Sequence, residues 1–344
     1  MVYSWKRSEK MKDMYILGIE SSCDETSVSI VKNGREEIAT VVSSQIDIHK
    51  SYGGVVPEIA SRNHVKNITI VLDECLTKAK MTMDDIDAIA VTYGPGLIGS
   101  LLIGLEAAKT LAFIHKKPLI PVHHIAGHIY ANSLVKEMTY PLLALVVSGG
   151  HTDLILMEEE YKFKKLGGTL DDAIGEAYDK VSRVIGLPYP GGPKLDKLAH
   201  EGTPSYKLPI PLKDDSYNFS FSGLKSAVIN LAHNEEQRGR EIIKEDLAAS
   251  FQKVAVTEII NKTRKAIKDF KINNLIVAGG VAANSEVREQ VTILCKEEEI
   301  EFSFPPIKYC TDNAAMIAAA GYFAYKHGKN ADMSLNSKSV DSLK

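Results

Sequence analysis

The sequence has few cysteines and no long apolar run. No two of its four cysteines form a CxxC pair; they are Cys23, Cys75, Cys295 and Cys310. Such wide spacing argues against a zinc knuckle and against a disulfide framework. No segment approaches the roughly 18 consecutive apolar residues of a membrane span. The first residues, MVYSWKRSEKMKDM, are partly basic but are not followed by the apolar segment of a signal peptide. We therefore expect a reduced, cytoplasmic protein without a membrane partner.

The chain also lacks an excess of positive charge. Its 344 residues carry a formal net charge of −3 at pH 7. A protein that binds nucleic acid unaided is usually more basic, because neutralised phosphates supply most of the affinity. Any contact with nucleic acid must therefore be local or shared with a partner.

Apolar residues are plentiful and periodic. They make up 44% of the chain, and a chain of this length is expected to form two domains. Strand-like segments alternate with helical periodicity, which is typical of an α/β fold. The predicted strands are 15–22, 26–31, 87–94, 142–150, 152–157 and 274–280. The predicted helices are 62–79, 99–114, 171–185, 245–270, 284–298 and 312–326.

Three segments fall outside this alternation. Residues 1–13 and 328–344 are polar, and we expect a flexible extension and a flexible tail. Residues 188–211 hold six of the thirteen prolines and show no period. A long ordered insertion of this kind is more often functional than not, although a plain surface excursion is the alternative.

A weak internal repeat connects the two halves of the chain. LGIESSCDETSVSIV (17–31) and LALVVSGGHTDLILM (143–157) each run from a strand through a small polar turn into a second strand. Two facing hairpin tips can hold a polyphosphate between two lobes. Each hairpin alone is as consistent with plain structure. The strand–GG–helix segment AGGVAANSEVREQV (278–291) strengthens the functional interpretation.

The segment PVHHIAGH (121–128) is a candidate metal site. His124 and His128 are four residues apart, so on a helix they share a face and both reach one ion. A bare HxxxH pair is weak evidence, because most such pairs are ordinary surface or core residues. The residue after the first histidine is Ile125, whereas a zinc protease needs glutamate there. Peptide hydrolysis by that route is therefore disfavoured.

Nine motifs in order give a more specific indication. They are GIESSCDET, GPGLIGS, HHIAGH, VSGGHT, DDAIGEAYDKV, YPGGP, FSFSGLKSAV, AGGVAANSEVR and CTDNAAM. Over about residues 14–327 this set resembles the TsaD/Gcp family of bacterial tRNA threonylcarbamoyladenosine transferases, which are related to the Kae proteins.

The resemblance implies a fold and an activity. The fold would be the two-lobe α/β fold of actin, hexokinase and Hsp70, built from duplicated ribonuclease H-like domains. The N-lobe would span 14–135, the C-lobe 136–311, and a returning helix 312–327. The activity would be transfer of threonylcarbamoyl from threonylcarbamoyl-AMP to the exocyclic amine of the adenosine next to the anticodon, in tRNAs reading codons that begin with A.

The resemblance also implies a ligand set for one divalent metal ion. Asp312 of the TDN motif would join His124 and His128 as the third ligand. Thr311 or Asp312 as an ordinary helix N-cap is the alternative. Two imidazoles favour a transition metal, so iron is preferred over zinc or magnesium.

The remaining site residues carry over from matching motifs. Those implied to bind adenine nucleotide or threonylcarbamoyl-AMP in the cleft are Val146, Val147, Ser148, Gly149, Gly150, His151, Glu176, Asp179, Gly192, Asp196 and Asn284. Asp24 and Glu25, at the first hairpin tip, are the catalytic candidates. The alternatives are a tight turn at 146–150, a salt-bridging face at Glu176, an N-cap at Asn284 and plain turn residues at 24–25.

The implied partners are tRNA, a TsaB-like paralogue, a TsaE-like ATPase and a TsaC-type synthase that supplies threonylcarbamoyl-AMP. Helix 99–114 is apolar nearly all round. Helix 62–79 has an apolar stripe with Val71 and Leu76 beside it; the stripe consists of Val65, Ile68, Leu72, Cys75 and Ala79. Part of this surface could dock the paralogue, or the two helices could simply cover each other and the sheet. A non-catalytic TsaB-like scaffold and a metallopeptidase remain the competing functions.

Overall fold

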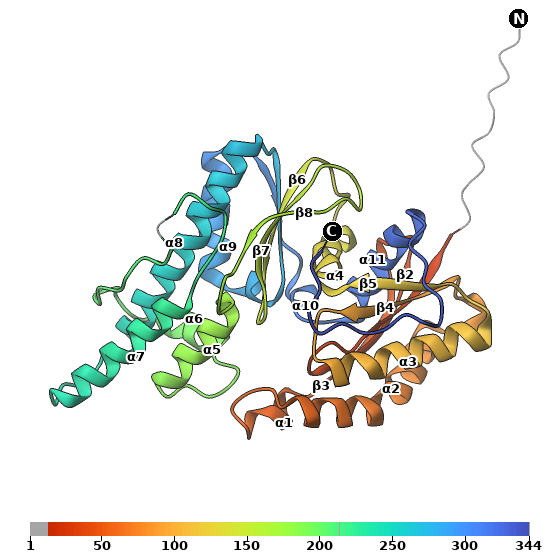
Figure 1. The fold of residues 1–344 in the computed structure, drawn as a ribbon, viewed down its shortest axis with the longest axis horizontal. Coiled ribbons are helices and arrows are strands. Elements are labelled where there is room, and N and C mark those ends of the chain that lie inside the picture. Colours follow the sequence, from red (N-terminus) through yellow and green to blue (C-terminus); the bar gives the residue numbers. More distant parts are fainter. Residues whose placement is uncertain (1–12, 213, 344) are drawn as a thin grey trace, which may run out of the picture.

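The computed structural model describes residues 13–212 and 214–343, which form two lobes side by side (Figure 1). The N-lobe is built on a five-stranded sheet in the order β3-β2-β1-β4-β5. Its strands are β1 (Tyr15–Glu20), β2 (Glu25–Lys32), β3 (Glu36–Ser44), β4 (Ala88–Gly94) and β5 (Leu119–His123). The first three strands are antiparallel neighbours, while β4 and β5 run parallel to β1.

The C-lobe repeats this sheet. Its order is β8-β7-β6-β9-β10, with β6, β7 and β8 antiparallel and β9 and β10 parallel to β6. The strands are β6 (Leu142–Val147), β7 (Thr152–Met157), β8 (Lys164–Gly168), β9 (Asn274–Ala278) and β10 (Glu301–Ser303). Because the order and directions match those of the N-lobe strand for strand, the weak sequence repeat reflects a duplicated fold.

The N-lobe sheet is covered on both faces. The helices α2 (Pro57–Ala79) and α3 (Ile98–His115) pack on one face, and α11 (Ala314–Lys326) packs on the other. Gly18 permits the close contact of α11 with β1, since a Cβ there would lie 2.4 Å from the Ala314 carbonyl oxygen. The last helix of the chain thus returns to the first lobe.

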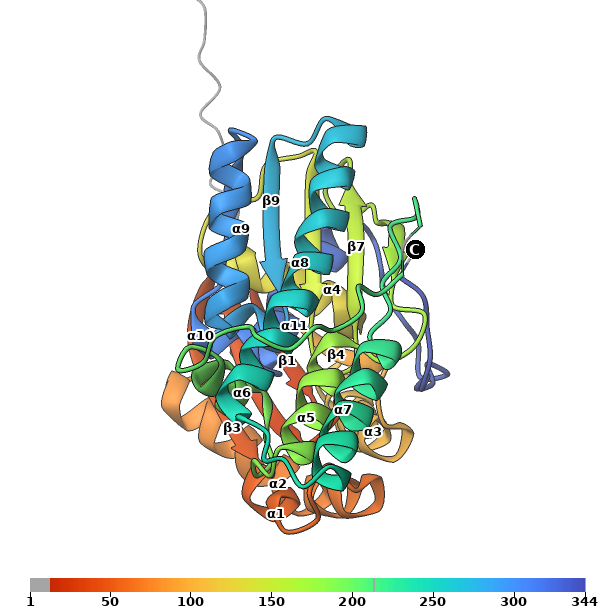
Figure 2. The ribbon, with the colours of Figure 1, turned by 90° about the vertical axis from the view of Figure 1, so that its left-hand side faces the viewer.

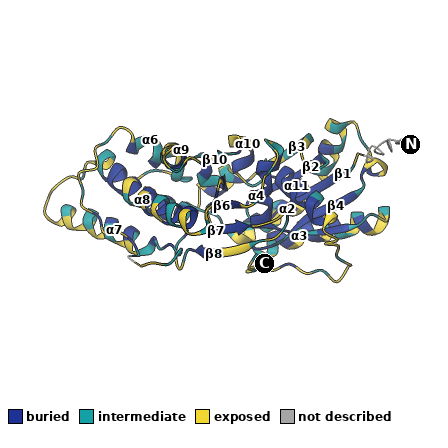
Figure 3. Ribbon diagram, turned by 90° about the horizontal axis from the view of Figure 1, so that it is seen from above, coloured by how far each residue is buried: buried dark blue, intermediate teal, exposed yellow. Residues whose placement is uncertain are grey.

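The C-lobe helices cover the outer face of their sheet (Figure 2). They are α5 (Ile174–Val184), α6 (Gly192–Ala199), α7 (Ser222–Gln237), α8 (Lys244–Phe270) and α9 (Ser285–Glu297). The inner face packs with α4 (His124–Tyr130) and α11 in a core that also includes residues of β4 and β5. Seen from above, buried residues run without a break from one lobe into the other (Figure 3). This shared core holds α4 between the lobes.

Short elements complete the described chain. They are α1 (Ile46–Lys50), α10 (Ile307–Cys310) and the 3₁₀ turns η1 (Met83–Asp85), η2 (Ala131–Leu134) and η3 (Gly280–Ala283). The six predicted strands and six predicted helices all form, with boundaries shifted by a few residues. The strands β3, β5, β8 and β10 and the helices α1, α6, α7 and α10 were not predicted.

The predicted apolar stripe of helix 62–79 is only partly right, because Ile68 and Cys75 are buried but its other members are not. The buried face of α2 carries Ala60, His64, Ile68, Val71 and Cys75. Val65 is exposed, and Val71, expected beside the stripe, is only 3% exposed. The helix α3 is long and apolar enough to cross a membrane by length and composition alone, but here it packs on β4 and α2.

The expectation of a flexible tail at 328–344 is wrong for its described residues, 328–343. Ala331 bridges to Leu119 of β5, the Lys338 amide donates to the Tyr93 carbonyl, and the Tyr93 hydroxyl donates to Asp341. These backbone and side-chain bonds hold the segment on the N-lobe. The extension predicted at 1–13 lies outside the described residues except for Asp13, which pairs with Lys32 at 2.8 Å.

Candidate metal centre and substrate cleft

The paired histidines lie where three parallel strands end. The strands β1, β4 and β5 are adjacent and point their carboxyl ends to one edge of the sheet, and α4 starts directly after β5. His123 caps α4 by accepting a hydrogen bond from the Ile125 amide at 3.2 Å, so its ring points away from the pair. The rings of His124 and His128 meet edge to face at 4.6 Å between centroids.

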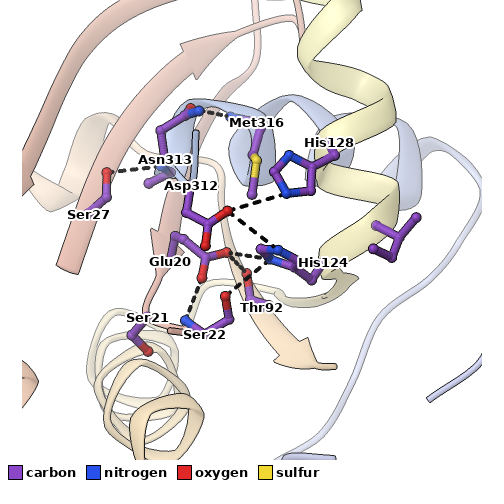
Figure 4. A network of polar contacts seen from close by, with 12 residues as sticks. Glu20, Ser21, Ser22, Ser27, Thr92, His124, His128, Asp312, Asn313 and Met316 are labelled. Carbon is purple, nitrogen blue, oxygen red and sulfur yellow. Dashed lines mark hydrogen bonds and ion pairs between the residues drawn. The ribbon is translucent and has the colours of Figure 1, made fainter. Parts of the chain in front are cut away.

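Asp312 completes the group from the other end of the chain (Figure 4). Its Oδ1 lies 3.5 Å from Nε2 of His124 and 3.3 Å from Nε2 of His128. The alternative of a capping role for Thr311 or Asp312 is wrong, because Asn313 caps α11 by accepting from the Met316 amide at 3.0 Å. The carboxylate of Asp312 is thereby left free to face the imidazoles.

These three side chains fit a metal ion. One donor atom from each lies within 4.8 Å of the others. Both ring nitrogens of His128 are buried without a hydrogen-bond partner in the described structure, which a metal bond at Nε2 would relieve. Three ligands of this type leave coordination positions open for substrate oxygens.

The charges around the group favour a cation. Burial lowers the pKa of His124, but the negative charges of Asp312 and Glu20 outweigh it and raise that pKa to about 9. Burial acts to raise the pKa of Asp312, yet the positive charge of His124 and the close contact with His128 hold it well below its usual range. A proton on His124 therefore occupies the place that a metal cation would take.

The first hairpin tip lies against this centre. Asp24 lines the cleft together with His124 and Asp312 and is 7% exposed. His64 of α2 fixes the tip, since its Nδ1 lies 2.7 Å from the Thr26 hydroxyl and its Nε2 lies 2.9 Å from the Cys23 carbonyl oxygen. The hairpin, predicted as a polar turn, is held rigidly by the helix behind it.

Glu25 behaves differently from its neighbour. Burial, together with the negative charges of Asp24 and Asp312, raises the pKa of Glu25 to about 9. Its Oε1 accepts a hydrogen bond from the Ser44 hydroxyl at 3.0 Å. Glu25 therefore carries a proton at neutral pH, and of the two predicted catalytic acids only Asp24 faces the cleft as a candidate proton acceptor.

A cleft extends from the metal residues between the lobes. Its cavity has a volume of about 680 Å³ and is lined from the C-lobe by the second hairpin tip, 148–151, and by Glu176 and Asp179. A second cavity of about 250 Å³ continues into the C-lobe and shares Gly149 and Asp179 with the first. It is also lined by Gly192, Asp196 and Asn284. The structure thus brings together both hairpin tips and the strand–GG–helix segment along one path.

Several cleft glycines are not explained by protein packing. A Cβ built on Gly149, Gly150 or Gly280 meets no atom within 4 Å. Gly279 is different, because its φ of +92° and a Val147 carbonyl oxygen 2.3 Å from its Cβ position both require glycine. The open glycines are therefore where a ligand can approach the backbone closely.

The predicted polar residues have partners of their own. Asp179 Oδ1 accepts from the amides of Gly191 and Gly192 at 2.8 and 3.1 Å, and burial raises its pKa. Asp196 accepts from the amide and hydroxyl of Ser285 at 2.9 Å. These contacts tie the proline-rich segment, α5 and α9 into one wall of the second cavity.

Asn284 and Glu176 make the structural contacts expected of them and also line the cavities. Asn284 caps α9 through the Val287 amide at 2.9 Å, while its amide nitrogen lies 3.3 Å from Gln252 and its side chain lines the cavity. Glu176 lines the cleft and pairs with Lys180 at 2.6 Å. The alternative interpretations from sequence therefore describe real contacts without removing these residues from the cleft.

Two predicted binding residues do not reach the cleft. Val146 and Val147 lie inside β6, are fully buried, and point into the hydrophobic cores on opposite faces of the sheet. The assignment of this motif to ligand contact is corrected to Ser148, Gly149, Gly150 and His151. Burial lowers the pKa of His151 to about 3, so this residue is neutral in the cleft.

Other cleft residues were missed from sequence. They are Ser22, Cys23, Gly53, Gly54, Val55, Pro95, Gly96, Leu97, Lys180, Arg183 and Tyr189 in the first cavity, and Gly175, Tyr178, Pro190, Pro193, Gly280, Val281 and Ala283 in the second. The GPGLIGS motif could have indicated that residues 95–97 line the cleft. The proline-rich segment supplies Tyr189, Pro190 and Pro193, which supports its functional interpretation.

Solved structures of low sequence identity share the fold. The structure of T. kodakarensis HypF matches with a TM-score of 0.64 at 12% identity, over 94% of this chain and 49% of that one. Component A of the (R)-2-hydroxyglutaryl-CoA dehydratase of Acidaminococcus fermentans matches with a TM-score of 0.55 at 17% identity, over 91% and 98%. These likenesses and the duplicated sheets confirm the predicted actin/hexokinase/Hsp70-like fold.

Sequence comparisons are more specific. The family model described as TsaD, tRNA N6-adenosine threonylcarbamoyltransferase, matches residues 36–319. The tRNA N6-adenosine threonylcarbamoyltransferase of Bacillus anthracis is 60% identical over 327 residues, which are 94% of this chain and 95% of that protein. The protein of the same name from Geobacillus thermodenitrificans is 57% identical, over 94% and 96%. The chain therefore belongs to the TsaD family of tRNA N6-adenosine threonylcarbamoyltransferases.

Proposed function

We propose that this protein transfers the threonylcarbamoyl group from threonylcarbamoyl-AMP to the exocyclic amine of the adenosine next to the anticodon, in tRNAs that read codons beginning with A. The observation that carries the proposal is the His124, His128 and Asp312 group at one end of a cleft whose other end is lined by open glycines. Family membership supplies the identity of the reaction. Because its substrate is tRNA, the enzyme acts in the cytoplasm.

The chemistry requires positioning, charge stabilisation and removal of a proton. Threonylcarbamoyl-AMP is a mixed anhydride, so AMP leaves readily, whereas the adenine amine is a poor nucleophile because its lone pair is delocalised. The amine nitrogen bonds to the carbamoyl carbon, the bond from that carbon to the AMP oxygen breaks, and AMP departs with the electron pair. Asp24 accepts the proton released by the amine. A divalent metal at His124, His128 and Asp312 supplies Lewis-acid stabilisation of substrate oxygens when bound.

The two cavities suit the two ends of the adenylate. The second cavity, with Asn284 and Asp196 on its wall, takes the adenosine, and the Gly149–Gly150 tip approaches the phosphate. The carbamoyl group then reaches the metal residues in the first cavity. The target adenosine lies in a single-stranded loop, so exposing it to the cleft costs little. Iron is the proposed metal, with zinc and magnesium as the alternatives to be measured.

Two competing functions are weaker. A metallopeptidase needs a general base beside the metal-binding helix, and the position after His124 is the buried, apolar Ile125. A non-catalytic scaffold has no need of three metal ligands whose donor atoms converge. Both alternatives are addressed by the assay below.

The test uses purified full-length protein with its partner proteins, threonylcarbamoyl-AMP and an unmodified tRNA whose anticodon reads a codon beginning with A. We expect mass spectrometry of the digested tRNA to find one threonylcarbamoyladenosine per molecule. A matched tRNA with that adenosine replaced by guanosine should gain none. Modification of neither tRNA, with metal and partners present, would contradict the proposal.

Gly149→Ala should weaken adenylate binding without destabilising the fold. The new methyl group meets no protein atom within 4 Å and projects where the phosphate is proposed to lie. We expect calorimetry to show affinity for AMP reduced at least about tenfold, with a melting temperature within about 2 °C of wild type. Gly279→Ala is the contrast, since its positive φ and close carbonyl predict loss of stability instead. Wild-type AMP affinity in Gly149→Ala would remove the tip from the site.

The proposed protein partners are a TsaB-like paralogue and a TsaE-like ATPase, with a TsaC-type synthase supplying the substrate. The helices α2 and α3 leave large apolar side chains exposed, including Ile70 at 61% and Phe113 at 74%. Such exposure on neighbouring helices is typical of a docking surface. Val71 and Leu76, which the sequence places beside the apolar stripe, are unsuitable for testing this surface, because Val71 is buried and Leu76 is half-buried.

Ile70→Glu and Phe113→Glu should each weaken binding to the paralogue by roughly tenfold or more, because a charge is placed in an apolar interface. Ile210→Glu is the matched control, since Ile210 is 55% exposed but lies in a C-lobe loop. Co-purification and calorimetry measure the effect. Equal affinity for wild type and both N-lobe variants would show that the paralogue docks elsewhere.

A further inference from the structure

Behind the metal residues lies a carboxylate that the mechanism does not use. Glu20, the last residue of β1, is 0% exposed and lines neither of the two cavities of the cleft. It cannot touch a substrate held there. A buried carboxylate is costly unless it is paired and hydrogen-bonded, so its contacts need an explanation.

Both oxygens of Glu20 are held by fixed donors (Figure 4). Oε1 accepts from the Ser22 amide at 2.5 Å, and Oε2 accepts from the Thr92 hydroxyl at 2.5 Å. Thr92 lies on β4, the parallel neighbour of β1, and is 1% exposed. These bonds fix the carboxylate plane, and Oε2 then lies 3.4 Å from Nδ1 of His124. The Ser22 hydroxyl lies 3.2 Å from the same nitrogen.

Of these two partners of Nδ1, the hydroxyl can donate or accept, whereas the carboxylate can only accept, so Glu20 favours one nitrogen of His124 for a metal. With Nδ1 facing Glu20, the neutral imidazole carries its proton on Nδ1 and leaves the lone pair on Nε2, which faces Asp312. His128 has no such partner, because its Nδ1 has no hydrogen bond in the described structure. Glu20 therefore acts on one ligand only.

The charge of Glu20 also matters. Two neutral imidazoles and one carboxylate leave a net charge of +1 on a bound divalent ion. A second buried carboxylate, one imidazole away, brings the whole group to neutrality without occupying a coordination position. The second ring nitrogen of a metal-bound histidine almost always donates to a carboxylate, a backbone carbonyl or a water, and such a partner fixes the ring and raises its basicity.

We propose that Glu20, held by Thr92 and the Ser22 amide, is a positioning residue that sets the tautomer and orientation of His124 for metal binding. It rests on the metal centre in the proposed function, but not on the reaction. The simpler alternative is that Glu20 only joins the ends of β1 and β4.

Glu20→Gln separates these two roles. A glutamine can still join the strands, because its oxygen accepts from the Ser22 amide and its nitrogen donates to the Thr92 hydroxyl. That nitrogen then faces Nδ1 of His124 and favours the tautomer in which Nδ1 accepts, which the Ser22 hydroxyl also permits because it can donate. The proton moves to Nε2 and blocks the metal-binding position. A purely structural role predicts no such effect.

The experiment is Co²⁺ titration of the metal-free full-length protein at fixed pH, followed by visible absorption. We expect Glu20→Gln to bind Co²⁺ about 10- to 100-fold more weakly, with a changed band intensity, while its melting temperature in chelator stays close to wild type. Glu258→Gln is the matched control, since Glu258 is a buried carboxylate (4% exposed) on α8 of the C-lobe. It should bind Co²⁺ as wild type does.

Wild-type affinity and spectrum in Glu20→Gln would overturn the proposal. If that variant fails to fold, Thr92→Val takes its place, because it removes one donor and lets the carboxylate turn away from His124. Unchanged Co²⁺ binding in Thr92→Val would then overturn the proposal as well. Failure of the wild-type protein to bind Co²⁺ would instead refute the metal centre itself, and with it the proposal.

Discussion

His128→Ala should produce a folded protein that carries no metal and has lost more than about 99% of its transfer activity. The substitution leaves two of the three converging donors, and one of those, His124, then keeps its proton between Asp312 and Glu20. Mutation of a residue that only hydrogen-bonds a metal ligand typically weakens metal binding by about 10- to 100-fold, so removal of the ligand itself should weaken it further. Elemental analysis of the purified variant measures the loss.

The fold should survive this change. His128 is 1% exposed, and its two ring nitrogens make no hydrogen bond in the described structure, so packing and the 3.3 Å contact of Nε2 with Asp312 are lost. We expect a decrease of roughly 1 to 3 kcal/mol in the free energy of unfolding. His49→Ala is a suitable control for metal content, because His49 is equally buried but lies on α1 and lines neither cleft cavity. A full metal complement in His128→Ala would contradict the ligand assignment.

The metal group illustrates how far sequence patterns reach. The spacing of His124 and His128 on one helix face follows from local periodicity, and the pair could be proposed from the short segment 121–128 alone. Asp312 could not, because it is brought to them by the return of α11 to the first lobe. Its role came only from the resemblance. The cap of α11 was also misplaced by one or two residues, since a TDN segment offers three side chains of capping type and Asn313 is the one used.

The apolar stripe predicted for α2 was only partly right for a related reason. Its buried face includes His64, which a purely hydrophobic pattern does not count, and Ala60, which lies before the predicted start. His64 is buried because it hydrogen-bonds the first hairpin tip. Because the apolar pattern does not count His64, it places the neighbouring Val65 on the buried face, whereas the structure exposes Val65.

The C-terminal segment escaped prediction because backbone contacts hold it. Its polar composition resembles that of a flexible tail, but the Lys338 amide and the Ser339 carbonyl bond to residues 93 and 96 of the N-lobe. Backbone groups are present in every sequence, so composition carries no signal for such contacts. The role of Glu20 was not predicted from the sequence either, because its partners Thr92 and His124 lie 72 and 104 positions away along the chain.

The two neighbouring acids of the first hairpin, Asp24 and Glu25, should respond very differently to replacement by their amides. Asp24→Asn is expected to slow transfer by about 10²- to 10⁴-fold, the usual range for removing a general base. Metal content and adenylate affinity should remain, because Asp24 lies outside the metal ligand group and outside the second cavity. Single-turnover kinetics with bound threonylcarbamoyl-AMP isolates the chemical step from binding.

Glu25→Gln is the matched comparison, because the amide resembles the protonated acid already present at neutral pH. Burial and the charge of Asp24 raise the pKa of Glu25 to about 9, so the folded protein resists its ionisation. Since the folded pKa lies above the unfolded one, wild type loses stability as pH rises from about 4.5 toward 9. Glu25→Gln does not, so its stability relative to wild type should increase between about pH 5 and pH 8, which thermal unfolding at the two pH values measures. Its transfer rate should fall less than about tenfold. If Glu25→Gln proves as slow as Asp24→Asn, or if Asp24→Asn keeps its rate, then Asp24 is not the proton acceptor.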